Sequence, residues 1–150
     1  MDFKKIIVWI IAIILIAQIG YYFYSKNNIG LEKENVTIGQ QIYSLWVADN
    51  QDERSRGLQN ITKMKDKQGM LFKFDDLQEV SFWNKDTYID LVILWVKDYT
   101  VIGVDNLSGQ IDNNIVSVSS PDKVDTVIEL KQNQIEQNNL KVGDKINILK

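Results

Sequence analysis

Cysteine and histidine are both absent from this 150-residue sequence. Their absence excludes thiol nucleophiles, disulfide bonds and imidazole general bases, together with nearly all zinc, copper and haem sites. Any chemistry therefore depends on carboxylates, Lys, Tyr, Ser or Thr, or on a hard cation bound by oxygen ligands. The D-x-[DN]-x-[DN]-G spacing of an EF-hand is also missing. We accordingly expect no cofactor and no metal site.

Basic residues are too few and too scattered to suggest a nucleic-acid partner. The formal net charge is −3, and no segment is dense in Lys or Arg. Proteins that bind nucleic acids usually concentrate positive charge on one face. Apolar residues at 45% and charged residues at 25% match ordinary globular usage. The sequence therefore predicts a folded domain with no nucleic-acid partner.

The N-terminus contains the longest apolar run of the chain. Residues 6–24 are apolar apart from Gln18, and about twenty such residues in a helix span a hydrocarbon core of ~30 Å. Trp9 lies near one end of the run and Tyr21, Tyr22 and Tyr24 near the other, where interfacial aromatic rings are common. A cleaved secretory signal would have a shorter apolar region that ends in small residues. We expect an uncleaved transmembrane anchor over residues 1–25, with the cleaved signal and a buried soluble helix as alternatives.

The segment after the anchor predicts a tether and a location. Residues 26–35 are polar and look like a short tether to a globular domain over residues 36–150. Lys4 and Lys5 precede the apolar run, and a short basic tail ordinarily stays in the cytoplasm. Lys26 and Lys33, which follow the apolar run, nearly balance these two charges. We expect a single-pass protein of the cell membrane whose domain is extracytoplasmic, with an oligomeric state that the sequence leaves open.

Short segments rich in β-branched and aromatic residues dominate the remainder. Residues 91–96 form an unbroken apolar run, which predicts a strand covered on both faces. Within residues 41–47, Tyr43, Leu45 and Val47 share an apolar face that we expect in the core. Other expected elements are strands at 36–38, 70–74, 100–104, 115–118, 126–130 and 146–149, and a short polar helix at 131–139. The prediction is a mainly β (α+β), small barrel-like or sandwich domain of seven to eight short strands with one or two short helices.

A helix of one or two turns is predicted at residues 50–57. Asn50 is a good N-cap, Glu53 stands three residues on as in a capping box, and Gly57 is a helix stop. The segment carries Arg54 and Arg56, the only two arginines of the chain. They either offset the C-terminal end of the helix dipole or present a planar cation to a carboxylate or another anion.

The stretch before the central strand, residues 82–90, is polar and charged. If it is extended, Trp83, Lys85 and Thr87 share one face and Asn84, Asp86 and Tyr88 share the other. Polar groups would then lie at the mouth of the buried strand. The candidate binding residues are Arg54, Trp83, Lys85, Asp86, Thr87 and Asp90.

Three functions fit this constellation. Trp beside hydrogen-bonding groups is a common way to hold a sugar or another small polar ligand, and an envelope partner is the related possibility. A hydrolase would use Asp86 and Asp90, with Glu79, as acid and base at ~5 to 9.5 Å. A purely structural domain would bury Trp83 and form one Arg–carboxylate pair. Binding requires Trp83 half-exposed beside Arg54, and this is the function we predict, without assigning catalytic residues.

Several ordered motifs carry a family resemblance. They are Glu53-Arg54-x-x-Gly57-Leu58, Gly69-Met70-Leu71-Phe72-x-Phe74, Phe82-Trp83-x-Lys85-x-Thr87-Tyr88-Ile89-x-Leu91, Glu129-Leu130 and Val142-Gly143-Asp144. Together they resemble the DUF192 family, also called UPF0127. The resemblance implies a small β-rich barrel that is often exported or membrane-anchored, with no established biochemical activity.

The chain departs from the family pattern at four positions. The family commonly shows Trp-Met-Lys-Asn-Thr followed by Pro-Leu-Asp. Here Asn84 replaces the Met, Asp86 the Asn, Asp90 the Pro and Val92 the Asp. The carboxylate thus stands two positions earlier. Side chains two positions apart lie on the same side of a strand. In an extended chain Asp90 would therefore project to the same side as the family's Asp, ~6.6 Å along the strand from it.

Overall fold

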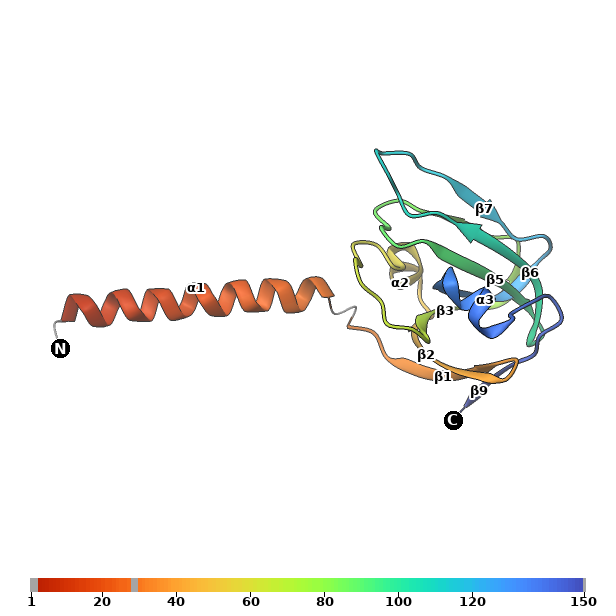
Figure 1. Ribbon diagram of the computed structural model, residues 1–150, viewed down its shortest axis with the longest axis horizontal. Helices are drawn as coiled ribbons and strands as arrows, with labels where there is room; N and C mark the ends of the chain where they lie inside the picture. Colours follow the sequence, from red (N-terminus) through yellow and green to blue (C-terminus); the bar gives the residue numbers. More distant parts are fainter. Residues whose placement is uncertain (1–2, 28–29, 150) are drawn as a thin grey trace. The chain divides into compact units, whose positions relative to one another are not determined.

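The computed structural model describes residues 3–27 and 30–149 and divides into two compact units, Met1–Gly30 and Leu31–Lys150 (Figure 1). The first unit contains a single helix, α1 (Phe3–Asn27). Within the described residues, no helix combines the length and the apolar character that a membrane crossing requires. The side chains of Tyr21, Tyr22 and Tyr24 lie outside the described residues, as do residues 28 and 29 of the predicted tether.

The second unit is mainly β. Its larger sheet has the order β6-β5-β8-β3-β2-β1-β9 and is antiparallel except for the parallel pair β2 and β3. A separate two-stranded ribbon pairs β4 with β7. The elements are β1 (Lys33–Ile38), β2 (Gln41–Ala48), α2 (Gln51–Arg56), β3 (Gln68–Gln78), β4 (Ser81–Trp83), β5 (Leu91–Lys97), β6 (Thr100–Leu107), β7 (Ser117–Ser119), β8 (Val124–Lys131), α3 (Asn133–Asn138) and β9 (Ile146–Leu149). The mainly β, barrel-like prediction is confirmed, with nine strands in the described residues where seven or eight were expected.

The two edge strands of the large sheet meet at one end. Thr100 at the start of β6 forms a β-bridge with Lys145, just before β9. The N–H of Ile146 donates to the carbonyl of Tyr99 at 2.9 Å. The sheet is therefore a half-barrel closed at one end, and part of each edge is protected from pairing with another chain.

The inner face of the half-barrel holds the main core. Tyr43, Leu45 and Val47 lie in it, as their alternation predicted. Ile135 of α3 packs against this cluster from the side. The buried members are Val36, Ile38, Tyr43, Leu45, Val47, Leu71, Val92, Leu94, Val96, Val101, Ile128, Leu130, Leu140 and Ile146.

A second apolar layer covers the opposite face of the central strands. Phe72 of β3 and Trp95 of β5 are buried there, out of phase with the inner core. Phe82 of the β4–β7 ribbon contacts both rings edge-on, with centroid separations of 4.7 Å to Phe72 and 5.7 Å to Trp95. Every residue of 91–96 is buried. The prediction of a central strand covered on both faces is confirmed.

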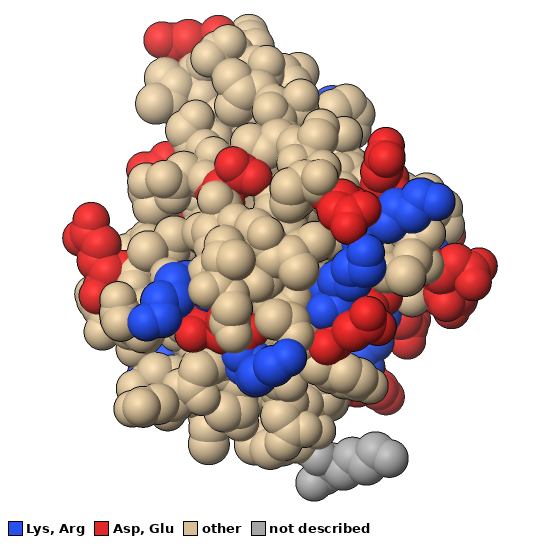
Figure 2. Space-filling model, turned by 90° about the vertical axis from the view of Figure 1, so that its right-hand side faces the viewer, with Lys and Arg blue, Asp and Glu red and all other residues tan. Residues whose placement is uncertain are grey.

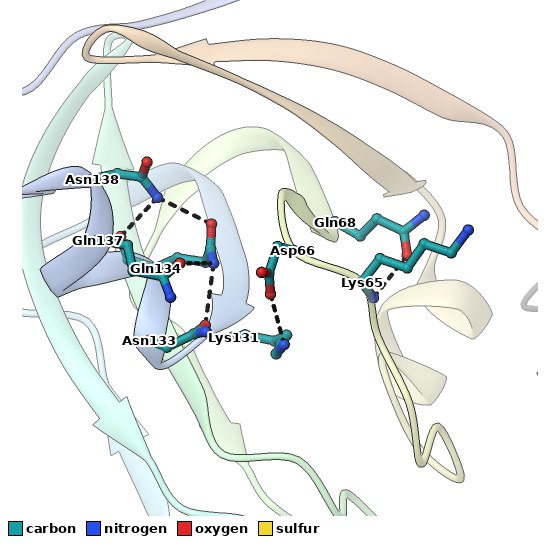
Figure 3. Close-up of polar contacts among 8 residues, drawn as sticks. All are labelled: Lys65, Asp66, Gln68, Lys131, Asn133, Gln134, Gln137 and Asn138. Carbon is teal, nitrogen blue, oxygen red and sulfur yellow. Dashed lines mark hydrogen bonds and ion pairs between the residues drawn. The ribbon is translucent and has the colours of Figure 1, made fainter.

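Polar contacts fix α3 and the loop before β3 (Figure 3). Gln134 is buried and donates to the side chains of Asn133 and Gln137 at 3.2 and 3.0 Å. Lys131, at the end of β8, forms an ion pair of 2.8 Å with Asp66. The end of β8 is thereby tied to a loop 65 residues earlier in the sequence, while the Gln134 contacts lie within α3.

Charges of both signs are mixed on the surface. On the face drawn in Figure 2, Lys and Arg lie among Asp and Glu, and the upper part is mostly uncharged. Ion pairs join Lys73 to Glu34 at 2.7 Å and Lys97 to Asp122 at 2.9 Å. This face therefore presents no continuous field of one sign to a partner.

The predicted boundary between tether and domain is wrong. Residues 33–35 were assigned to the tether, but they belong to β1 and pair with residues 44–46 of β2. The Nζ of Lys33 lies 4.5 Å from the centroid of the Trp46 ring. Pairing with a neighbouring strand here outweighs the low strand propensity of the sequence Lys-Glu-Asn.

Residues 82–90 do not form one extended segment, so the two-face arrangement that an extended chain would give does not occur. Strand β4 ends at Trp83, and the N–H of Thr87 donates to the carbonyl of Asn84 at 3.0 Å in a turn. Asp86 within that turn has φ +54°, a left-handed conformation that Asp tolerates better than most residues. The turn breaks the alternation, so Asn84 and Thr87 are buried while Lys85 and Tyr88 are exposed.

Candidate binding site

A pocket of about 340 Å³ lies between α2, the end of β3 and the following strand β4. We call it the outer pocket. Its wall combines aromatic rings with amide and hydroxyl side chains. The lining residues are Gln51, Arg54, Ser55, Phe74, Gln78, Val80, Ser81, Phe82 and Trp83.

Trp83 reaches the outer pocket because of its place at the end of β4. Side chains alternate along this strand, so Phe82 packs into the outer apolar layer while Trp83 points away from it. Pairing of Trp83 with Ser117 of β7 fixes the strand. Trp83 is 52% exposed. The Nζ of Lys85 lies 5.4 Å from the ring centroid, in cation–π range.

The predicted helix signals of α2 are confirmed. The Oδ1 of Asn50 accepts a hydrogen bond of 3.0 Å from the N–H of Glu53, and Gly57 ends the helix with φ +48°. Glu53 reaches back to the N–H of Asp49 at 3.2 Å, one residue before the position of a standard capping box. These hydrogen bonds lower the pKa of Glu53, although burial opposes them as the largest single influence.

Arg54 is held by backbone carbonyls where a carboxylate partner was one of the expectations. Its Nη1 donates to the carbonyl of Asp49 at 2.6 Å and to that of Lys73 at 2.9 Å. Its guanidinium carbon lies 5.2 Å from the centroid of Phe74. The guanidinium is thereby fixed between α2 and β3, in the wall of the outer pocket.

A smaller inner chamber of about 30 Å³ adjoins the outer pocket. The two share Arg54, Ser55, Phe82 and Trp83 as lining residues. The inner chamber adds Arg56, Gly57, Leu58, Gln59, Phe72, Thr87 and Glu129. Glu129 lies on β8 opposite Met70 and Ile93, so it belongs to the outer apolar layer.

Glu129 is the carboxyl group of this chamber. It is 4% exposed, and its Oε2 has no hydrogen-bond partner among the described residues. Burial raises the pKa of Glu129 to about 8, because the charged form loses its hydration. The carboxyl group is therefore mostly protonated at pH 7, with one O–H donor and free acceptor capacity.

The structure brings three of the six predicted site residues together. Arg54 and Trp83 line both cavities, and Thr87 lines the inner chamber. Lys85 lines neither cavity but contacts the Trp83 ring.

Asp86 and Asp90 line neither cavity. The N–H of Asp86 donates to Oε1 of Gln110 at 2.6 Å, and the Oδ1 of Asp90 accepts from the N–H of Gly109 at 2.8 Å. Both aspartates thus hold the loop that follows β6.

Sequence reasoning missed Glu129 as a site residue. Its signal was available, because a single carboxyl interrupts the apolar run 127–130 and belongs to a motif of the family resemblance. Burial of that carboxyl, however, depends on the segments that cover the outer layer. Glu129 is the one acidic residue among those lining the two cavities, so they do not gather the two carboxylates that the hydrolase prediction requires.

Comparison with known proteins bears on the fold and the family. Curated proteins give no match. The chain is similar to the crystal structure of a proposed transcription regulator from Sinorhizobium meliloti 1021, with 24% identity, a TM-score of 0.73 and coverage of 79% of this chain and 95% of that one. It is also similar to a protein of unknown function from Novosphingobium aromaticivorans DSM 12444, with 23% identity, a TM-score of 0.72 and coverage of 79% and 86%. These likenesses concern the fold alone. The model of DUF192, described as an uncharacterized ACR, matches residues 34–148, and the chain therefore belongs to the DUF192 family.

Proposed function

We propose that the globular domain binds a small polar ligand of carbohydrate type in the outer pocket. The observation that carries this proposal is the half-exposed Trp83 ring in a pocket that also contains Arg54. An exposed aromatic ring beside hydrogen-bonding side chains is a common arrangement in sites for small polar ligands. The volume of about 340 Å³ lies at the lower end of the range for small-molecule sites.

The chemistry of the wall suits a sugar. The indole of Trp83 offers a flat apolar face to the C–H groups of a pyranose ring. Four uncharged side chains around it provide donors and acceptors for hydroxyl groups, namely Gln51, Ser55, Gln78 and Ser81. Neutral groups of this kind match a neutral polyol better than they match a strongly charged ligand.

Arg54 supports the same ligand class. Its Nη1 is used by two backbone carbonyls, which fixes the position of the planar group. A guanidinium carries five N–H donors, and the ones beyond Nη1 are suited to sugar oxygens. We propose that Arg54 orients the ligand on the Trp83 ring.

Ligand binding is tested on the full chain with glucose, galactose, mannose and N-acetylglucosamine as probes. We expect at least one sugar to raise the melting temperature of the protein, and Trp83→Ala to remove the effect. The matched control is Tyr99→Ala, since Tyr99 is an exposed aromatic residue in the β5–β6 turn. The proposal is refuted if none of the four sugars changes the melting temperature, or if Trp83→Ala responds as the unchanged protein does.

We also propose that residues 6–24 anchor the chain in the cell membrane, with the domain on the extracytoplasmic side and within reach of an envelope partner. The apolar sequence of this segment, with aromatic residues near both ends, supports the anchor. The chain should remain in the membrane fraction after an alkaline wash, and removal of residues 1–25 should release it. Protease added to intact spheroplasts should degrade the domain. Recovery of the full chain in the soluble fraction would refute the anchor, and protection from protease would refute the orientation.

A further inference from the structure

We infer that Glu129 forms the floor of the binding site and that its carboxyl group takes an uncharged amide or hydroxyl group of the ligand inside the inner chamber. The inference deepens the proposed function, on which the carbohydrate nature of the ligand rests. It assigns to one residue the recognition of a specific chemical group.

The unpartnered oxygen of Glu129 is the first observation. Nearly all buried polar groups in proteins have a hydrogen-bond partner. Oε2 of Glu129 is buried and has none among the described residues. Its neighbours in register, Met70 and Ile93, are apolar and offer no side-chain partner. Packing of the sheet therefore gives no reason for an acid at this position.

Access from the outer pocket is the second observation. The inner chamber shares four lining residues with the outer pocket, and Trp83 is one of them. Its volume of about 30 Å³ exceeds the ~10 to 15 Å³ that a single water molecule needs. A small substituent of a ligand that stacks on Trp83 can therefore extend to Glu129.

The charges around the chamber select an uncharged substituent. Arg54 and Arg56 line the chamber with permanent positive charges, which oppose entry of an ammonium group. Burial raises the pKa of Glu129 to about 8, so at pH 7 the chamber floor carries a mostly neutral carboxyl group and offers no ionic partner. A protonated carboxyl can donate its O–H to an amide or hydroxyl oxygen and accept a hydrogen bond from the same group.

Acetamide and ethylene glycol are the probes, because both are small enough to test the chamber without the outer pocket. Binding to the full chain is followed by NMR through the backbone N–H signals of Gly57 and Leu58, which line the chamber. We expect both probes to shift these signals in the unchanged protein. Glu129→Gln should bind the probes equally well, because its amide keeps one donor and one acceptor in the same place. Glu129→Met keeps the length but loses both, and should bind about tenfold more weakly or worse.

The pH dependence separates the uncharged substituent from a cationic one. Ionisation of Glu129 removes the O–H donor, so acetamide should bind the unchanged protein more weakly above pH 8 while Glu129→Gln shows no change. Tighter binding of methylammonium than of acetamide, or binding that strengthens above pH 8, would overturn the inference.

The remaining outcomes separate the inference from the proposed function. Absence of any acetamide or ethylene glycol shift in the unchanged protein overturns the inference whatever the sugars do. A sugar that binds Glu129→Met as well as the unchanged protein overturns the inference and leaves the proposed function standing. Shifts by the two small probes without binding of any of the four sugars support the chamber and refute the proposed carbohydrate ligand.

Discussion

The side-chain oxygen of Asn84 accepts a hydrogen bond of 2.9 Å from the backbone N–H of Val116. The same amide donates through Nδ2 to the carbonyls of Ser108 and Asn114 at 3.0 and 3.3 Å. Asn84 is 1% exposed and directly follows Trp83. One buried amide thus fastens the loop between β6 and β7 to the strand end that presents the candidate ligand-binding ring. The Met found here in the family pattern could make none of these hydrogen bonds.

Asn84→Leu should therefore destabilise the domain by about 2 to 4 kcal/mol, since it leaves two part-buried carbonyls and one N–H without their partner. Urea denaturation measures the loss, and hydrogen exchange at Val116 should accelerate. Asn114→Ala is the matched control, because Asn114 is exposed and contributes its backbone carbonyl to the contact. Equal stability of the two variants would show that the Asn84 side chain does not hold the loop.

The raised pKa of Glu129 should make the stability of the folded domain decline as the pH rises. Its pKa is raised from 4.5 to about 8 in the folded protein, so between these values the folded state keeps a proton that the unfolded state has lost. The free energy of unfolding should then fall by about 1.4 kcal/mol per pH unit within that window and level off outside it. Glu129→Gln abolishes the titration. The difference in unfolding free energy between the two proteins should change by about 3 kcal/mol from pH 5 to pH 7, and a constant difference would contradict the raised pKa.

The sequence was informative wherever the determinant was local. Alternation of apolar residues gave the core face of β2, and Asn50 with Gly57 gave the ends of α2. The turn after Trp83 could not be read in the same way. It depends on hydrogen bonds from Asn84 to residues 24 to 32 positions later in the chain. Such partners become visible after the strands have been placed beside one another.

The same limit explains the mixed result for the candidate site. Arg54 and Trp83 line the same cavities because Phe82 packs β4 against Phe72 of β3, beside α2. Asp86 and Asp90 were included on the assumption of an extended chain, and the turn directs them to the following loop. Glu129 was overlooked because burial of a carboxyl depends on segments distant in sequence, here α2 and β4.

Removal of the Tyr43 hydroxyl should stabilise the domain. Its hydroxyl is buried in the main core without a hydrogen-bond partner among the described residues, and burial raises its pKa to about 12. Tyr43→Phe removes the unsatisfied hydroxyl and keeps the ring, so the domain should become more stable by about 1 kcal/mol. Tyr43→Leu tests the ring itself and should destabilise through the cavity that it leaves. A loss of more than about 1 kcal/mol in Tyr43→Phe would mean that the hydroxyl has a partner in solution.

Gly69 sets the distance between β3 and β8 beside the candidate site. It pairs with Leu130, and a Cβ atom at this position would lie 2.1 Å from the backbone carbonyl oxygen of Glu129 and 2.8 Å from a methyl group of Leu130. A backbone oxygen cannot rotate away as a side chain can, so Gly69→Ala must displace β8 itself. We expect a loss of about 3 kcal/mol or more in the free energy of unfolding.

Gly20→Ala is the control for this substitution, because a Cβ there meets nothing within 4 Å. It should leave unfolding of the β domain unchanged. Displacement of β8 also moves the Glu129 carboxyl, so Gly69→Ala should weaken acetamide binding at a temperature where the variant is still folded. Normal stability in Gly69→Ala would contradict the close approach of β3 and β8 at this position. The position of the Glu129 carboxyl at the floor of the inner chamber would then also be wrong.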